Sequence, residues 1–168
     1  MGSRQPRRLV IGIGNPLRRD DGCGLEVARR LRDQAPPAEA ILVWEGEPIA
    51  LLDRWDGATE VVVVDATASC GSPGAIRRFN ATRRTLPARL FSLSSHAVGL
   101  GETIETARAL GRLPASLIVY GIEGSDFGLG VGLTAEVERS ASRVADRLSA
   151  RIRARYSPVT RSRRAVTA

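Results

Sequence analysis

Three residues of types that bind divalent metal ions stand out in the chain: Asp21, Asp65 and His96, the only histidine. Asp21 follows an apolar run and a glycine turn, Asp65 ends a run of four valines, and His96 follows a serine pair. Two carboxylates and an imidazole suit a borderline divalent ion such as nickel or zinc. These three residues are therefore the candidate catalytic and metal-contacting site.

Each of these residues also has a structural interpretation. An acid just before a helix is commonly a cap or a dipole partner. We favour that interpretation for Asp20 and keep it open for Asp21. Asp65 is harder to dismiss, because the four valines before it place it at the rim of a sheet rather than on a solvated face. A lone histidine is more often structural than catalytic.

Several common catalytic motifs are missing. Leu17 follows the glycines at 12 and 14, so the third glycine of the dinucleotide-binding fingerprint is lacking. A P-loop needs a lysine and an HExxH zinc site needs two histidines, whereas this chain has no lysine and one histidine. A Ser-His or a Cys-His hydrolase stays open, the latter with Cys23 as its thiolate, because nucleophile and base need only meet in space. The glycines on both sides of Cys23 favour a small packed residue instead.

The apolar pattern predicts the elements that position the candidate site. Strands are predicted at residues 9–13, 41–44, 60–65, 75–79 and 116–122. Helices are predicted between them, with Ser94 and Ser95 as caps of the helix that His96 opens, and a last helix spans residues 133–152. This alternation indicates an α/β fold with a mainly parallel sheet of about five strands, in which 75–79 is an edge. Ligands of such sheets bind at the carboxyl ends of the strands, where we expect the candidate residues to lie.

The net charge of +7 invites comparison with nucleic-acid-binding proteins. The excess is confined to residues 140–168, which hold eight arginines and one acid. The arginines at 151–155 suit the negative end of a helix dipole. We therefore predict one α/β domain over residues 1–155, a disordered arginine-rich tail over residues 156–168, and no specific nucleic-acid ligand.

Cysteine usage and apolar run length indicate the compartment. Cys23 and Cys70 show neither a CxxC spacing nor the cysteine density of a secreted scaffold. The longest apolar runs are too short to span a bilayer, and the basic N-terminus lacks a signal-peptide core. We predict a cytoplasmic protein that makes no membrane contact.

The motifs together resemble a known family. Residues 10–24, VIGIGNPLRRDDGCG, resemble the opening signature of the nickel-iron hydrogenase maturation proteases, roughly GxGNxLxxDDGxG. Residues 64–66 resemble their third-strand aspartate, and residues 95–100 their histidine segment, SPHxxGL. Residues 121–123 and 132–134 resemble the family's closing strand and the start of its last helix. The motifs occur in the family's order along most of the chain.

This resemblance implies a three-layer α/β/α fold, with a twisted sheet between helix layers. It also implies an endopeptidase that removes a C-terminal extension from a hydrogenase large-subunit precursor after nickel insertion. The family's metal contacts map to Asp21, Asp65 and His96. Nickel would then arrive with the precursor as a recognition element rather than stay as a permanent cofactor. Metal contact would position the scissile peptide, and either polarise its carbonyl or activate water.

Some positions depart from the family pattern. Ser95, Gly124 and Ala135 stand where proline is usual, and residues 44–47 replace an acid and two glycines. The three metal contacts are unaffected, but the hydrogenase subgroup is left unassigned. The oligomeric state is likewise not indicated by the sequence.

Two other functions compete with the protease. Peptidyl-tRNA hydrolases also open with an apolar strand and GxGNPG, but they continue into a histidine-containing segment, and this chain has no histidine before His96. The second rival is a non-catalytic nickel-binding or assembly chaperone for the same precursor. The sequence does not separate that chaperone from a protease whose metal comes with the substrate.

Overall fold

The computed structural model describes residues 8–34, 40–91 and 98–156. In chain order the elements are β1 (Arg8–Ile13), the 3-10 turn η1 (Arg19–Gly22), α1 (Cys23–Gln34), β2 (Ala40–Trp44), η2 (Pro48–Ala50), α2 (Leu51–Arg54), β3 (Glu60–Thr67), β4 (Ile76–Asn80), η3 (Ala88–Leu90), α3 (Leu100–Ala109), β5 (Ser116–Glu123) and α4 (Ala135–Tyr156).

The strands form one sheet in the order β2-β1-β3-β5-β4. The first four pair in parallel, and β4 lies antiparallel to β5 at the edge. The predicted mainly parallel five-stranded sheet is therefore confirmed. An edge tolerates charged side chains, which accounts for Arg77 and Arg78 within β4.

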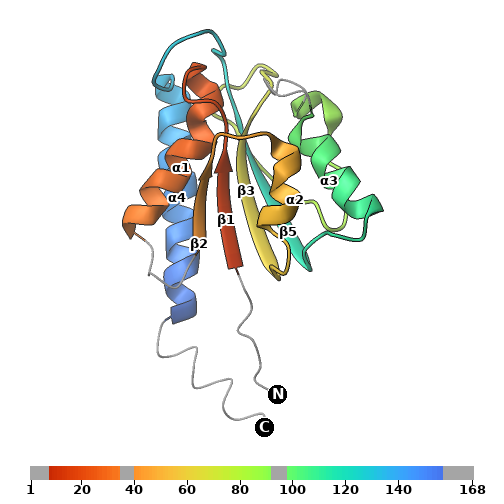
Figure 1. Ribbon diagram of the computed structural model, residues 1–168. Helices are drawn as coiled ribbons and strands as arrows, with labels where there is room; N and C mark the ends of the chain where they lie inside the picture. Colours follow the sequence, from red (N-terminus) through yellow and green to blue (C-terminus); the bar gives the residue numbers. More distant parts are fainter. Residues whose placement is uncertain (1–7, 35–39, 92–97, 157–168) are drawn as a thin grey trace.

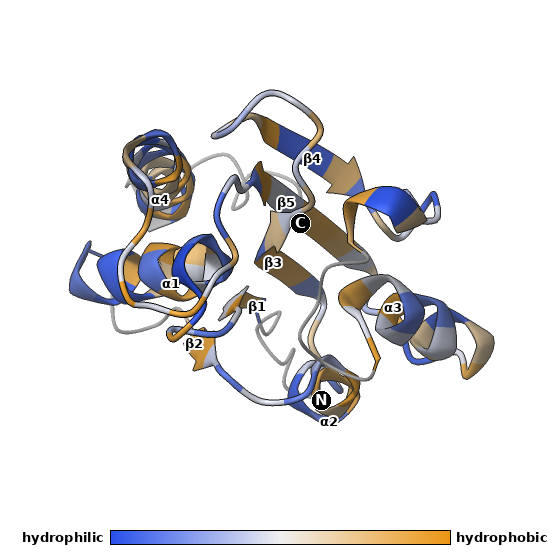
Figure 2. Cartoon of the chain, turned by 90° about the horizontal axis from the view of Figure 1, so that it is seen from above, coloured by the Kyte–Doolittle hydropathy of each residue, from blue (hydrophilic) through white to orange (hydrophobic). Residues whose placement is uncertain are grey.

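Helices cover both faces of the sheet, as the three-layer prediction required. Helices α1 and α4 lie on one face, and α2 and α3 on the other (Figures 1 and 2). Alternate residues of each inner strand enter different cores. In β1, for example, Leu9 and Ile11 pack toward α2 and α3, whereas Val10 packs toward α1 and α4.

Two helix starts differ from the predictions. Helix α3 begins at Leu100, with Gly99 as its N-cap, so the predicted serine caps are wrong. The Glu102 carboxylate accepts a hydrogen bond from the Gly99 N–H at 2.7 Å and satisfies the helix start instead. Helix α4 begins at Ala135 rather than at Leu133.

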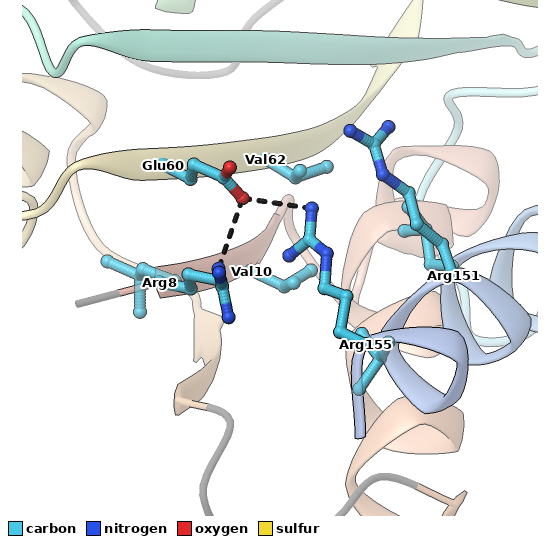
Figure 3. A pocket seen from close by; sticks show the side chains of 9 residues that line it. Arg8, Val10, Glu60, Val62, Arg151 and Arg155 are labelled. Atoms are coloured by element: carbon cyan, nitrogen blue, oxygen red, sulfur yellow. Dashed lines mark ion pairs between the residues drawn. The ribbon is translucent and has the colours of Figure 1, made fainter. Parts of the chain in front are cut away.

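The amino ends of the strands carry part of the arginine excess. Glu60, which opens β3, pairs with Arg8 of β1 at 3.3 Å and with Arg155 of α4 at 2.9 Å (Figure 3). The remaining last-turn arginine, Arg153, is exposed and suits the helix dipole as predicted. The start of β1 and the end of α4 are thus held together at the amino ends of the strands.

The predicted division into a domain and a tail is only partly described. Helix α4 runs through the proposed boundary at 155 to Tyr156, and residues 157–168 lie outside the described residues. The disordered tail therefore stays a prediction. Over the described ranges, no helix combines the length and apolarity needed to cross a membrane.

Candidate active site

The structure brings Asp21 and Asp65 together at the carboxyl edge of the sheet. Asp21 lies in η1, directly after β1, and Asp65 lies near the end of the neighbouring parallel strand β3. Their exposed fractions are 7% and 9%. Burial, and then the negative charge of Asp21, raise the pKa of Asp65 well above its ordinary value. The two carboxylates therefore share one electrostatic environment.

Close backbone packing holds Asp21 in this position. A Cβ atom on Gly24 would lie 2.3 Å from the carbonyl oxygen of Val64, and one on Gly14 would lie 1.9 Å from that of Asp21. Gly14 also has a φ of 150°, which residues with a side chain rarely adopt. Glycine at both positions lets η1 and the first turn of α1 rest directly on the strand backbone.

His96, the predicted imidazole of the site, lies outside the described residues. Helix α3, which follows it, begins at Leu100. Over residues 8–34, 40–91 and 98–156, no group of three histidine, cysteine or acidic side chains could hold a metal ion. The described part of the candidate site is therefore its carboxylate pair, and the place of His96 stays a prediction.

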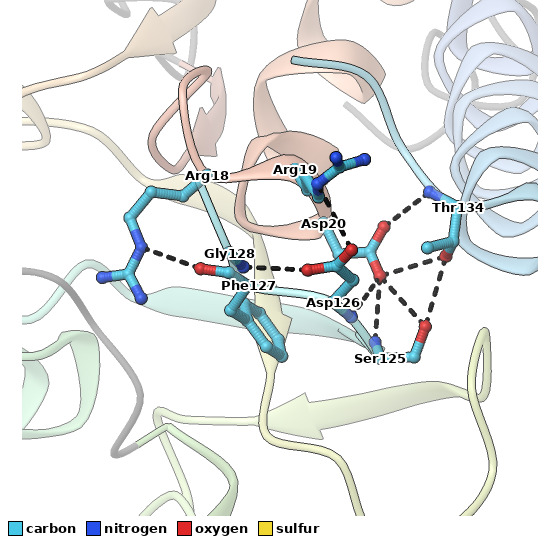
Figure 4. A network of polar contacts seen from close by, with 8 residues as sticks. All are labelled: Arg18, Arg19, Asp20, Ser125, Asp126, Phe127, Gly128 and Thr134. Atoms are coloured by element: carbon cyan, nitrogen blue, oxygen red, sulfur yellow. Dashed lines mark hydrogen bonds and ion pairs between the residues drawn. The ribbon is translucent and has the colours of Figure 1, made fainter. Parts of the chain in front are cut away.

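Asp20 points into a network with the loop before α4 (Figure 4). Its buried carboxylate accepts hydrogen bonds from the backbone N–H groups of Ser125, Asp126 and Thr134 at 2.9, 3.0 and 2.7 Å. The Thr134 hydroxyl donates at 3.0 Å. Burial alone would raise the pKa of Asp20, but these hydrogen bonds outweigh it and lower the pKa. Asp20 is therefore an ionised anchor.

This network corrects the predicted role of Asp20. We expected a cap or dipole partner for the helix that follows it, but its hydrogen-bond partners lie in the loop before α4, up to 114 residues away along the chain at Thr134. Ser125 and Thr134 have no role at the site in the predictions made from the sequence. A threonine at the start of a helix is a typical N-terminal signal, so Thr134 could have been found.

Further contacts join η1 to the same loop. The Asp20 N–H donates to the Asp126 carbonyl at 3.0 Å, and the Arg18 guanidinium donates to the Phe127 carbonyl at 3.2 Å. Arg19 pairs with the Asp126 carboxylate at 3.3 Å and has a φ of 46°, an uncommon backbone conformation for a residue with a side chain. The turn that carries Asp21 and residues 125–134 therefore form one connected unit.

Glu123 anchors the other side of the site. It ends β5, is fully buried, and accepts hydrogen bonds from the Cys70 and Ser72 N–H groups at 2.6 and 2.7 Å. It also pairs with Arg77 at 2.8 Å. Burial would raise the pKa of Glu123, but Arg77 and the two N–H groups outweigh it and lower the pKa. An acid closing an apolar strand is the signal that identified Asp65, and it also marks Glu123.

Cys23 is unsuited to nucleophilic attack. Its side chain is fully buried. Burial, followed by the charges of Asp65, Asp21 and Asp20, raises the pKa of the Cys23 thiol well above its ordinary value. Since the thiolate is the reactive form, this environment disfavours the cysteine hydrolase considered from the sequence. The small packed residue is the interpretation that the structure supports.

Comparison with known proteins identifies related sequences. The family model of hydrogenase maturation proteases matches residues 25–150. The hydrogenase expression/formation protein HupD of Thiocapsa roseopersicina is 33% identical over 130 residues, covering 73% of this chain and 58% of that protein. The hydrogenase 2 maturation protease of Escherichia coli K12 is 26% identical over 137 residues, covering 79% and 82%. The chain thus spans less than two thirds of its HupD relative.

Solved structures show the same fold. The [NiFe] hydrogenase maturation protease HycI of Thermococcus kodakarensis KOD1 aligns with a TM-score of 0.71 at 24% identity, covering 88% of this chain and 92% of its own. The hydrogenase maturating endopeptidase HybD of E. coli gives 0.69 at 23% identity, with the same coverage. Together with the family match over residues 25–150, these alignments lead to one assignment. The chain belongs to the hydrogenase maturation protease family.

Proposed function

We propose that this protein is an endopeptidase that removes the C-terminal extension of a nickel-iron hydrogenase large-subunit precursor. In this proposal the cut follows nickel insertion, and the nickel in the precursor is the recognition element. Asp21, Asp65 and His96 contact that nickel. The observation that carries the proposal is the meeting of two buried carboxylates, Asp21 and Asp65, in a chain of this family.

The chemistry of the carboxylate pair supports a cation as its partner. Two neighbouring buried carboxylates repel each other, so one tends to hold a proton unless a cation compensates the charge. Burial, and then this repulsion by Asp21, raise the pKa of Asp65. Carboxylate oxygens with an imidazole nitrogen form a suitable donor set for nickel. A substrate that brings a divalent ion would therefore be favoured over the same substrate without it.

The residues of the chain have separable tasks in this proposal. Because the pKa of Asp65 is raised, this carboxyl loses its proton at a higher pH than an ordinary aspartate, so cation binding is linked to pH. Asp21 is fixed by the turn that Asp20 anchors, which keeps its carboxylate oriented before the substrate arrives. When present, nickel supplies a Lewis acid next to the scissile peptide.

The test compares two forms of one purified precursor, loaded with nickel or free of nickel. We expect a shortened large subunit only from the nickel-loaded form, seen by mass spectrometry. Cleavage of neither form would contradict the protease and leave the non-catalytic chaperone. Equal cleavage of both forms would contradict the nickel requirement. Release of free tRNA from peptidyl-tRNA would support the rival hydrolase instead.

Single substitutions test the site. Asp21→Asn, Asp65→Asn and His96→Ala are each expected to abolish cleavage while the circular dichroism spectrum is unchanged. Asp146→Asn is the matched control, because Asp146 is an exposed acid of α4. Full activity in all three site variants would show that the site is elsewhere.

A further inference from the structure

Three of the most exposed large apolar side chains gather on the unit that carries Asp21. Leu129, Val131 and Leu17 are 87%, 74% and 62% exposed. The Gly130 N–H donates to the Leu17 carbonyl at 2.9 Å, and the Gly130 carbonyl accepts the Arg19 N–H at 3.0 Å. These bonds bring Leu17 beside the residues that flank Gly130. We call Leu17, Leu129 and Val131 the apolar rim.

The backbone beneath the apolar rim is firmly held. Before it, Ser125 and Asp126 donate to the Asp20 carboxylate, and after it Thr134 does the same. Arg18 donates to the carbonyl of Phe127 within the same loop. Both ends of the loop are thus tied to η1. A surface that is ordered before binding loses less conformational entropy when a partner docks.

We propose that the apolar rim docks an apolar segment of the precursor polypeptide. This inference rests on the proposed function and adds the surface by which the substrate protein is held. Leu17 lies four residues before Asp21, and the Asp21 N–H donates to the Arg18 carbonyl at 3.0 Å. A polypeptide seated on the rim therefore lies beside the carboxylate pair. Exposed apolar side chains grouped in this way are typical of protein interaction sites.

The size of the rim favours a transient partner over a second copy of this chain. A stable interface buries about 800 Å² on each partner, which three aliphatic side chains do not supply. An enzyme that releases its product needs an interface of the smaller kind. The start of β1 and the end of α4 meet at Glu60. They lie at the amino ends of the strands, on the opposite side of the sheet from the rim.

The charges beside the rim favour an apolar partner over a polyanion. The charged residues that line a shallow hollow next to Val131 are two arginines and two glutamates: Arg19, Arg29, Glu26 and Glu138. Two positive and two negative groups leave no excess that would attract nucleic acid or acidic lipid. The rim therefore distinguishes its partner by apolar contact.

The experiment replaces the rim and measures steady-state cleavage of the nickel-loaded precursor. For the double variant Leu129→Ser and Val131→Ser we expect KM to rise about tenfold or more, with kcat changed less than twofold, since both side chains lose their apolar burial against the partner. Leu110→Ser is the matched control, because Leu110 is 60% exposed at the end of α3. An unchanged KM in the double variant, or an equal rise in the control, would overturn the inference.

A binding measurement separates this inference from the proposed function. The Asp65→Asn variant keeps the precursor intact, so its affinity can be measured by calorimetry with and without the rim substitutions. Weaker binding on loss of the rim supports the docking surface even if the wild-type protein cleaves nothing. Normal cleavage with unaltered binding overturns the docking surface and leaves the protease standing. If the wild-type protein is a dimer that the rim substitutions convert to a monomer with KM unchanged, the rim serves self-association. That result also overturns the docking surface.

Discussion

Asp20 accepts two hydrogen bonds from Thr134, one from its backbone N–H at 2.7 Å and one from its hydroxyl at 3.0 Å. This contact joins the turn after the first strand to the start of the last helix. Because Asp21 follows Asp20 directly, the geometry of the candidate site depends on residues near the other end of the domain. The stability of this link can be measured separately from catalysis.

Removing the link should destabilise the fold. Thr134→Val keeps the shape of the side chain but loses a hydrogen bond to a charged group, at an expected cost of about 1.5–3 kcal/mol. Asp20→Ala leaves several buried N–H groups without an acceptor and should cost about 3 kcal/mol or more. Urea unfolding gives both values. The double variant should cost less than the sum, by on the order of 1 kcal/mol, and strict additivity would argue against a direct link.

Glu123 should make stability depend on acid pH. Its folded pKa lies below the ordinary value of 4.5, so its contribution is present above pH 4.5 and is lost as the pH falls through the folded pKa. The difference in unfolding free energy between wild type and Glu123→Gln should therefore be constant near neutrality and shrink below pH 4.5. A difference that does not vary between neutral pH and acid would contradict ionic contacts at Glu123.

Asp65→Asn should stabilise the free protein while abolishing cleavage. Burial and the charge of Asp21 raise the pKa of Asp65, so its ionised form is unfavourable in the folded state. Its contribution is fully present below the ordinary value of 3.8 and is lost as the pH rises through the folded pKa. A neutral amide avoids that loss, so thermal unfolding at neutral pH should move a few degrees upward. A melting temperature below that of wild type would argue against an unfavourable buried charge at Asp65.

Cys23→Ala should retain cleavage at a rate within about threefold of wild type, because the buried, protonated thiol supplies no nucleophile. Thiol alkylation of the native protein is expected to modify Cys70, which is exposed, and to leave Cys23 untouched. Peptide mapping by mass spectrometry checks the site of modification. Inactivation by alkylation at Cys23 would reopen the cysteine hydrolase.

The sequence predicted the fold well, because the apolar runs of a buried parallel sheet are strong local signals. The four valines before Asp65 located β3, and a family motif located the turn at Asp21. The contacts of individual acidic residues were harder to predict. Asp20 contacts Thr134, and Glu123 contacts the loop at Cys70. No periodic pattern in the sequence marks either contact. Such contacts join distant segments and appear only once the chain is folded.

The same limit explains the wrong helix caps. Serine is a good N-cap by type, but Gly99 and Glu102 occupy the positions where helix α3 actually begins. A local rule identifies residues able to cap a helix, whereas packing of Leu100 and Ile104 against the sheet decides where the helix starts. The apolar rim could likewise not be predicted from the sequence, since exposure is a property of the folded chain.

The meeting of Arg8, Glu60 and Arg155 has a practical consequence for engineering. Because β1 starts and α4 ends at the edge of the sheet opposite Asp65, a fusion partner joined through either of these segments would be attached on the far side of the molecule from the carboxylate pair. Affinity tags or surface tethers placed there should leave substrate access free. A precursor tethered by a short linker at the same place could not present its own scissile bond, and would be processed only by another molecule.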